Sequence, residues 1–325
     1  MNIYISTKQT VFILFISSLL FLFSCNTPSN DKKTNTSQKE YKIIADSLIS
    51  LIKIYRGYGD SLSNEINKQV FKTMRDSTIN TNESFSMLYS YFIDLDNDST
   101  DEIVCLFGKS YEAGTLGIFD KANNSWYCLY FEDYYFFYPD YDFNNIHIID
   151  TLDEKLITIN RLVASGTGIY KQETDFLKLI NGTVYNVLTL INSNYINAWG
   201  TQLGMEVSSK YRFKKDPPSL ARFIVKYDYQ YYPGPSFGCG LKEEDHPEIP
   251  LIKGSKTLSY IWNPSGHKYK AELKNTGLSE AKLKAFDIMQ YNDTLIIQAF
   301  SDEIDSTIIN GTQQESMLLK HYINL

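Results

Sequence analysis

The chain has 325 residues, of which 31 are Lys or Arg and 38 are Asp or Glu, so its formal net charge is −7. Proteins that bind nucleic acid need clustered basic residues to neutralise phosphates, and this sequence has no basic run, so we expect no nucleic-acid partner. Its four cysteines show no CxxC spacing, which argues against a zinc site or a disulfide framework. The sequence does not decide whether Cys105 and Cys128 form a single disulfide.

The N-terminus has the pattern of an export signal. A polar segment with one cation, Lys8, precedes an apolar run over residues 11–23. As a helix this run would be about 20 Å long, too short for a hydrocarbon core of roughly 30 Å. It therefore predicts a cleaved signal peptide over residues 1–24.

The end of that run, Leu22-Phe23-Ser24-Cys25, resembles the bacterial lipobox. The resemblance implies a lipoprotein whose Cys25 carries a lipid anchor. The protein is then expected in the cell envelope, with its lipid anchor in the outer membrane and its folded part facing the periplasm or the exterior. The alternative is an ordinary signal peptide, or an uncleaved anchor, in which the cysteine is incidental. Residues 25–40 contain no large apolar residue, which predicts a flexible tether.

Two helices are predicted within residues 41–83. Apolar residues recur at helical spacing from Tyr41 to about Gly57, and a second such pattern runs from Ser61, an N-cap candidate, to Arg75. We expect these helices to cover one face or end of the sheet that follows, and we assign them no chemistry.

Residues 84–274 are rich in Tyr, Phe, Ile and Val with turn residues between them, which predicts a β-rich domain. Asn181-Gly182 is a strong signal for a two-residue hairpin turn. Beyond the first strand, the predicted strands are Glu102–Gly108, Thr115–Lys121, Ser125–Phe131, Ile146–Asp150, Lys155–Val163, Gly168–Ile180, Val184–Ile191, Met205–Phe213, Ala221–Tyr232, Thr257–Trp262 and Lys268–Leu273.

Residues 275–325 return to helical spacing, with helices predicted over Ser279–Gln290, Thr294–Ile309 and Gln313–Tyr322. The predicted fold class is therefore α+β. A β-rich centre of antiparallel meanders, either propeller-like or an irregular sheet, lies between N-terminal and C-terminal helices.

An acidic loop over residues 94–102 separates two of the predicted strands. Asp94, Asp96, Asp98 and Glu102 stand at relative positions one, three, five and nine. Because Ca²⁺ takes six to eight oxygen ligands, alternate carboxylates in a tight loop fit such an ion. The backbone carbonyl of Thr100 would add a neutral oxygen.

This loop resembles the calcium loop of FG-GAP and VCBS-type repeats, the integrin-like family with the pattern D-x-D-x-D-G-x-x-[DE]. The resemblance covers residues 89–119 and occurs once. It implies a structural Ca²⁺ that staples the β domain. Ser99 stands where the family has glycine, and Cys105 stands where an EF-hand would need its last Glu. The alternative is an acidic turn whose Asp side chains accept hydrogen bonds from their own backbone.

Aromatic residues beside carboxylates form a weaker candidate site. Tyr134, Tyr135, Tyr138 and Tyr141 are interleaved with Asp and Glu, and such rings can stack on sugars while the carboxylates bind hydroxyls. The set is therefore a candidate glycan or peptide site. We favour the alternative that Tyr and Phe simply suit half-buried strands.

The sequence contains no GxSxG, HExxH, P-loop or GxGxxG motif. Cys239 with His246 could form a thiol nucleophile and base, but a lone loop cysteine is more often incidental. The sequence therefore favours a non-enzymatic binding or scaffold lipoprotein with a Ca²⁺-stabilised β domain and a glycan or protein ligand. An envelope hydrolase acting on glycan or peptide is the alternative.

Overall fold

The structure is a computed structural model that describes residues 42–55, 61–75, 87–108, 113–135, 146–151, 154–198, 200–216, 220–236 and 249–324. The predicted signal peptide, Cys25 and the tether lie outside these residues. So do Tyr138, Tyr141, Cys239 and His246. Among the described residues, no helix is both long and apolar enough to span a membrane.

The first sheet has five strands in the order β1-β5-β4-β3-β2, and every pair in it is antiparallel. Asn123 and Asn124 adopt positive φ in the turn between β4 and β5, as a two-residue type I′ hairpin turn requires. The strands are β1 (Ile43–Ile44), β2 (Met87–Ile93), β3 (Glu102–Gly108), β4 (Ala113–Ala122) and β5 (Ser125–Tyr135).

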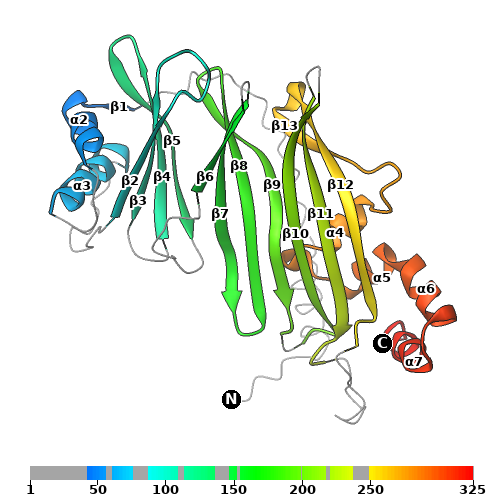
Figure 1. Cartoon of the computed structure of the whole chain (residues 1–325). Coiled ribbons are helices and arrows are strands. Elements are labelled where there is room, and N and C mark those ends of the chain that lie inside the picture. The colour runs from blue at the N-terminus through cyan, green and yellow to red at the C-terminus, as the bar shows by residue number, and fades with distance from the viewer. Residues whose placement is uncertain are drawn as a thin grey trace, which may run out of the picture. The chain divides into compact units, whose positions relative to one another are not determined.

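Helices α2 (Asp46–Ile54) and α3 (Ser61–Arg75) cover one face of this sheet (Figure 1). Their apolar side chains share a core with residues of β3, β4 and β5, in which the Phe71 ring meets the Phe107 ring edge-on. The predicted helix over residues 61–75 and the role of both helices as a cover are therefore confirmed.

The second sheet has eight strands that follow one another in chain order, so it is an unbroken antiparallel meander. At the β8–β9 turn Asn181 and Gly182 have φ of 49° and 73°, which confirms the predicted hairpin. The strands are β6 (Ile146–Thr151), β7 (Glu154–Gly166), β8 (Ile169–Ile180), β9 (Thr183–Ile196), β10 (Leu203–Asp216), β11 (Leu220–Pro233), β12 (Ile252–Asn263) and β13 (Lys268–Glu272).

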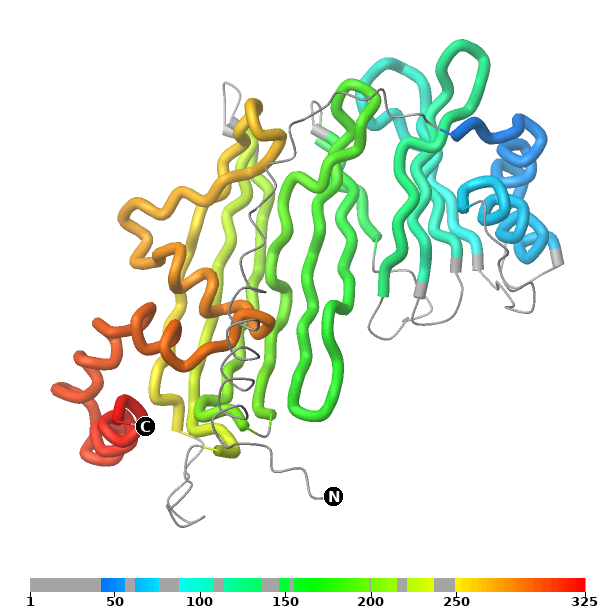
Figure 2. Tube along the Cα trace, turned by 180° about the vertical axis from the view of Figure 1, so that it is seen from behind, coloured from blue at the N-terminus to red at the C-terminus, as the bar shows by residue number. Residues whose placement is uncertain are grey.

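The C-terminal helices lie across one face of the eight-stranded sheet (Figure 2). Tyr227, Tyr229 and Tyr231 of β11 are buried there, and their rings pack on Phe286 and Phe300 of the helical segment. The helices are α4 (Glu280–Ala285), α5 (Asp293–Ala299), α6 (Ser301–Asn310) and α7 (Gln313–Tyr322), with short 3-10 helices η2 (Pro264–Gly266) and η3 (Ile288–Gln290).

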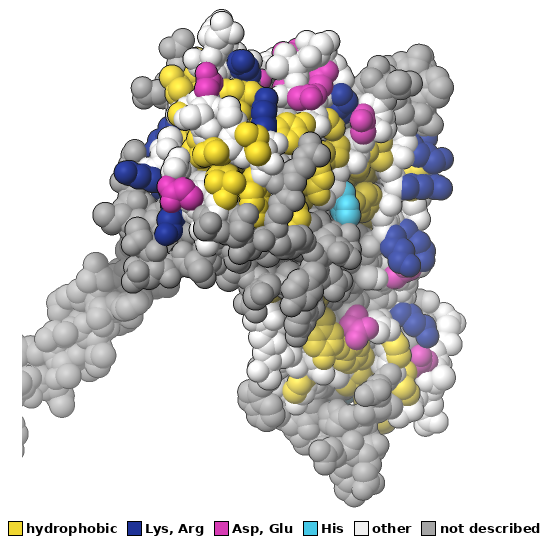
Figure 3. Space-filling view, turned by 60° about the vertical axis from the view of Figure 1, so that its left-hand side comes forward, with side chains coloured by type: hydrophobic (Ala, Val, Ile, Leu, Met, Phe, Trp, Pro, Cys, Tyr) yellow, Lys and Arg dark blue, Asp and Glu magenta, His cyan; other side chains and the backbone are white. Residues whose placement is uncertain are grey.

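A third apolar cluster contains residues of both sheets. Leu95, Val104 and Ile118 of the first sheet region share it with Ile157 and Leu177 of the second. On the face shown in Figure 3, hydrophobic side chains lie between separate acidic and basic ones. The α+β class with a β-rich centre and terminal helices is confirmed, and the β-rich centre forms two sheets and not the blades of a propeller.

Three predicted helices differ in their bounds. Residues 43–44 pair with β5, so the first helix begins at Asp46 and not at Tyr41. The second is the helix predicted over residues 279–290, which ends at Ala285 and is followed by the separate 3-10 helix η3, where the Asp287 carboxylate accepts a hydrogen bond from the backbone N–H of Met289. The third is at Phe300, which is fully buried at φ −115° and ψ 21° and divides the predicted 294–309 helix into α5 and α6.

Cys105 and Cys128 are not joined by a disulfide. They lie on β3 and β5, the two neighbours of β4. Their backbones are thus two strand spacings apart, about 10 Å, whereas a disulfide needs Cα atoms within about 7 Å.

Candidate metal centre

The acidic loop connects β2 to β3, whose ends are held together by the antiparallel pair Ile93 and Glu102. The chain must reverse within eight residues, and it does so with Asn97 at φ 65° and Ser99 at φ 74°. Ser99 is the position where the resembled loops have glycine. Its left-handed backbone shows why glycine suits this place.

Three carboxylates meet in the loop. Asp94, Asp96 and Glu102 each place one oxygen so that all three oxygens lie within 4.8 Å of one another. Ca²⁺ binds oxygen at about 2.3 to 2.6 Å, so two ligands on opposite sides of one ion are about 5 Å apart. The three oxygens are therefore close enough to share a single calcium ion.

Glu102 is the buried member of this set, with a side chain that is 0% exposed. Its Oε2 accepts a hydrogen bond from the backbone N–H of Leu95, whereas its Oε1 is buried without a hydrogen-bond partner among the described residues. Burial, aided by the negative charges of Asp96 and Asp120, raises the pKa of Glu102 to about 7. A buried carboxylate oxygen without a donor is costly unless a cation or a proton satisfies it.

Of the other two predicted ligands, Asp98 takes another position in the loop, and the contribution of the Thr100 carbonyl oxygen stays a prediction. The Asp98 carboxylate is outside the three-oxygen cluster and accepts a hydrogen bond of 2.7 Å from the backbone N–H of Thr100. The backbone N–H of Asp98 in turn donates to Asp94 Oδ1 at 3.0 Å, and that of Ser99 donates to Asp94 Oδ2 at 3.1 Å. The turn-forming hydrogen bonds of the alternative interpretation are thus present together with the cluster.

A further acid, Asp120 of β4, lies beside the loop and was missed by the sequence argument. It stands one residue beyond the pair Ile103 and Phe119, and therefore next to Glu102. Burial raises the pKa of Asp120, with a contribution from Asp98. Only the register of β3 and β4 could have revealed it, because nothing in the sequence around Asp120 resembles a metal loop.

The two aromatic candidates that the structure describes, Tyr134 and Tyr135, differ in burial. Tyr134 is buried, and its hydroxyl lies 2.5 Å from that of Tyr130. Tyr135, the next residue of β5, points to the opposite face of the sheet and is 65% exposed. The two rings therefore do not form one binding surface.

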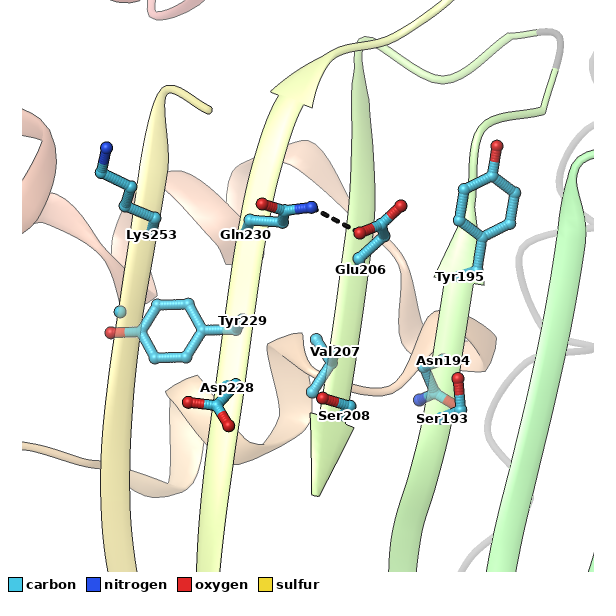
Figure 4. Close-up of a pocket in the computed structure, with 11 residues that line it drawn as sticks. Ser193, Asn194, Tyr195, Glu206, Val207, Ser208, Asp228, Tyr229, Gln230 and Lys253 are labelled. Atoms are coloured by element: carbon cyan, nitrogen blue, oxygen red, sulfur yellow. Dashed lines mark hydrogen bonds between the residues drawn. The ribbon is translucent and has the colours of Figure 1, made fainter. Parts of the chain in front are cut away.

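A groove of about 680 Å³ lies on the eight-stranded sheet (Figure 4). It runs across four strands, where Gln230 donates a hydrogen bond to Glu206 and where Tyr195 and Lys253 stand at the two sides. Asp228 in this groove has a lowered pKa because Lys226 and Ser255 donate hydrogen bonds to it. The groove offers hydrogen-bond donors and acceptors with an ionised carboxylate.

No protein-family model, curated protein or solved structure matches the chain. The likeness to FG-GAP loops therefore stays a prediction based on residues 94–102.

Proposed function

We propose that the acidic loop binds Ca²⁺ and that the ion stabilises the β domain of a lipid-anchored, non-enzymatic binding or scaffold protein of the cell envelope. The observation that supports this best is the buried Oε1 of Glu102, which has no hydrogen-bond partner among the described residues and belongs to a cluster with Asp94 and Asp96. A divalent cation would compensate three carboxylates and satisfy that oxygen at once.

The ion would act as a staple because of where its ligands stand. Asp94 follows the last residue of β2, Glu102 begins β3, and Asp120 of β4 lies beside them. Lys155 of β7 donates a hydrogen bond to the carbonyl oxygen of Asp94, which links the loop to the second sheet. A bound cation would compensate the negative charge of the loop and so stabilise the region where the two sheets meet.

Calorimetric titration of chelator-treated protein with Ca²⁺, together with melting curves, tests the proposal. We expect saturable binding that raises the melting temperature and that Asp96→Ala abolishes. Asp101→Asn is the matched control, because Asp101 is an exposed carboxylate of the same loop outside the cluster. Absence of saturable binding, or equal losses in both variants, would overturn the calcium site.

The lipid anchor has its own test. Cells expressing the chain are labelled with an alkyne analogue of palmitate and fractionated. We expect label and membrane association in the wild type and in Cys128→Ser, and loss of both in Cys25→Ser. Label that persists in Cys25→Ser would show that the lipobox resemblance is misleading.

The alternative function, an envelope hydrolase, would need a carboxyl group that stays protonated beside a substrate groove. In the groove of Figure 4 the pKa of Asp228 is lowered and not raised. Asp228 therefore does not fit the role of that acid.

A further inference from the structure

Exposed cations gather on the face of the eight-stranded sheet that is turned away from the C-terminal helices. Tyr227 packs on the helical segment, so its neighbour Lys226 points to the other face. Lys210 pairs directly with Lys226 across β10 and β11, and Arg212 and Lys214 follow at alternate positions of β10. All four side chains are exposed. Because paired residues and alternate residues share a face, the four form one group, which we call the basic patch.

The basic patch has one acid beside it among the described side chains of β10 and β11. The Lys226 ammonium lies 2.8 Å from Asp228, and its hydrogen bond lowers the pKa of that carboxyl group, with a smaller contribution from the charge of Lys210. Lys210, Arg212 and Lys214 make no ion pair with any residue that the structure describes. The positive charges of the basic patch therefore outnumber the negative ones.

The stability of the fold does not explain the basic patch. Lysines often protect the open edge of a sheet, but β10 and β11 each lie between two other strands. Like charges that are directly paired across strands are destabilising, as Lys210 and Lys226 are here. The chain as a whole has a net charge of −7, so its composition does not account for the patch either. Cations that the fold does not need favour an anionic partner.

The basic patch continues into the groove of Figure 4. Ser208, which lines the groove, stands two residues before Lys210 in β10, and Asp228, which also lines it, stands two residues after Lys226 in β11. Patch and groove are therefore neighbouring parts of one face. A ligand long enough to leave the groove along β10 would meet the cations.

The chemistry of the groove narrows the class of anion. The carboxylates of Glu206 and Asp228 repel phosphate groups but accept hydrogen bonds from hydroxyl groups. Tyr195 pairs directly with Glu206, and a ring beside a carboxylate suits stacking on a sugar. A sugar chain that carries both anionic groups and hydroxyl groups fits the whole face, whereas a nucleic acid fits the basic patch alone.

We propose that this face of the eight-stranded sheet binds an acidic polysaccharide, whose anionic groups contact the basic patch and whose hydroxyl groups contact the groove. The inference names the ligand class of the binding protein proposed above, and so rests on that binding function. It uses neither the calcium loop nor the lipid anchor.

The test is fluorescence anisotropy of labelled ligands titrated with the full chain in a neutral detergent, with chelator present throughout. An oligogalacturonate and a heparin oligosaccharide are the acidic probes, and they separate carboxylate from sulfate groups. A neutral maltooligosaccharide and an oligothymidylate are the controls. We expect at least one acidic probe to bind about tenfold more tightly than both controls, with an affinity that falls as the salt concentration rises.

Charge variants identify the basic patch. Lys210→Gln/Lys214→Gln should weaken binding of the acidic probe about fivefold and make it less sensitive to salt, because two exposed ion pairs with the ligand are lost. Lys68→Gln/Lys72→Gln removes the same charge from exposed positions of α3 and should leave binding unchanged. Equal losses in the two double variants would show that net charge alone matters and would overturn the basic patch as the site.

Tyr195→Ala tests the groove. It should weaken binding of the acidic probe about fivefold without changing the salt dependence, because a ring is lost and no charge. Tyr135→Ala, which removes an exposed ring of the first sheet, is the control and should bind like the wild type. A loss in Tyr135→Ala as large as that in Tyr195→Ala would contradict a site on the eight-stranded sheet.

The outcomes separate this inference from the earlier proposals. Because chelator is present, Ca²⁺ binding has no part in the titrations, and a chain without a calcium site should still bind the acidic probe. If neither acidic probe binds more tightly than the neutral sugar, or if oligothymidylate binds as tightly as both, the acidic polysaccharide is the wrong ligand. The calcium site and the lipid anchor would then still stand on their own tests.

Discussion

Leu95 and Glu102 are joined across the acidic loop by a hydrogen bond from the backbone N–H of Leu95 to Oε2 of Glu102. This contact satisfies one carboxylate oxygen and leaves Oε1 buried without a donor among the described residues. The loop therefore holds a buried acid in a position that suits a cation or a proton better than an empty space. The loop has two consequences for stability, one from the buried carboxyl group of Glu102 and one from the backbone conformation of Ser99.

The first concerns pH in the metal-free protein. Burial raises the pKa of Glu102 in the folded chain to about 7 from its ordinary value of 4.5. A raised carboxyl pKa means that the folded state binds the proton more tightly, so this contribution to stability is full below pH 4.5 and is lost as the pH rises to 7. The loss is on the order of 3 kcal/mol.

Urea unfolding in chelator between pH 4.5 and 8 measures this effect. We expect Glu102→Gln to flatten the fall in unfolding free energy with rising pH, because the amide does not ionise. Asp101→Asn should keep the wild-type slope. Parallel curves for the wild type and Glu102→Gln would contradict the assignment to Glu102.

The second consequence concerns the backbone of the loop. Ser99 has φ 74°, and a left-handed conformation costs a residue with a side chain about 1 to 2 kcal/mol relative to glycine. Glycine loses more backbone entropy on folding, which offsets part of this gain. We expect Ser99→Gly to raise the unfolding free energy by about 1 kcal/mol in urea titrations.

Ser99→Ala is the control for the lost hydroxyl, since alanine has the same backbone restriction. It should not stabilise the protein. A destabilised Ser99→Gly would mean that Ser99 contributes more through its side chain than its backbone conformation costs.

Local signals in the sequence predicted local structure well. The 61–75 helix, the Gln313–Tyr322 helix and the Asn181-Gly182 turn are found as expected, because helix periodicity and turn preference act over a few residues. The acidic loop is equally local, since the clustered carboxylates Asp94, Asp96 and Glu102 lie within nine residues of one another; its calcium binding stays a prediction.

The rest depended on contacts between distant segments. No local pattern tells which strands join which sheet, and the division of the meander into five and eight strands follows from the whole core. Asp120 beside Glu102, and the approach of Lys178 and Trp262 to the loop, likewise arise from strand register and from the meeting of the two sheets. Burial of Phe300, which divides the last long helical pattern, is also a tertiary effect.

Gly117 provides a test of packing within the first sheet. A Cβ at this position would lie 2.9 Å from ring atoms of both Phe107 and Phe119, which are fully buried. Because close-packed rings cannot move freely, we expect Gly117→Ala to lower the unfolding free energy by about 1 to 3 kcal/mol.

Gly166, at the end of β7, is the matched control. A Cβ there would meet no atom within 4 Å, so Gly166→Ala should be neutral or slightly stabilising by reducing the entropy of the unfolded chain. Equal effects of the two substitutions in urea unfolding would show that the ring contacts around Gly117 are not tight.

Lys171 links the eight-stranded sheet to the C-terminal segment through buried ion pairs. Its ammonium lies 2.8 Å from Glu173 and 2.6 Å from Asp287, and its side chain is only 5% exposed. Lys171→Met would leave these two carboxylates without that partner in a largely dry environment. Glu173 keeps its ion pair with Arg161, whereas Asp287 loses its ammonium partner, so we expect the unfolding free energy to fall by about 2 kcal/mol.

The exposed pair Lys226 and Asp228 separates this effect from the general loss of a lysine. Their side chains are 54% and 42% exposed, so solvent screens the attraction and Lys226→Met should cost less than about 1 kcal/mol. Hydrogen exchange is a second measurement. In Lys171→Met the amides of η3 and α4, next to Asp287, should lose protection first, because the broken ion pair between Lys171 and Asp287 joins that segment to β8. Uniform loss of protection, or a cost no larger than that of Lys226→Met, would show that other contacts hold the C-terminal segment on the sheet, among them the Phe286 ring and the hydrogen bonds that Asn194 and Tyr231 donate to its backbone.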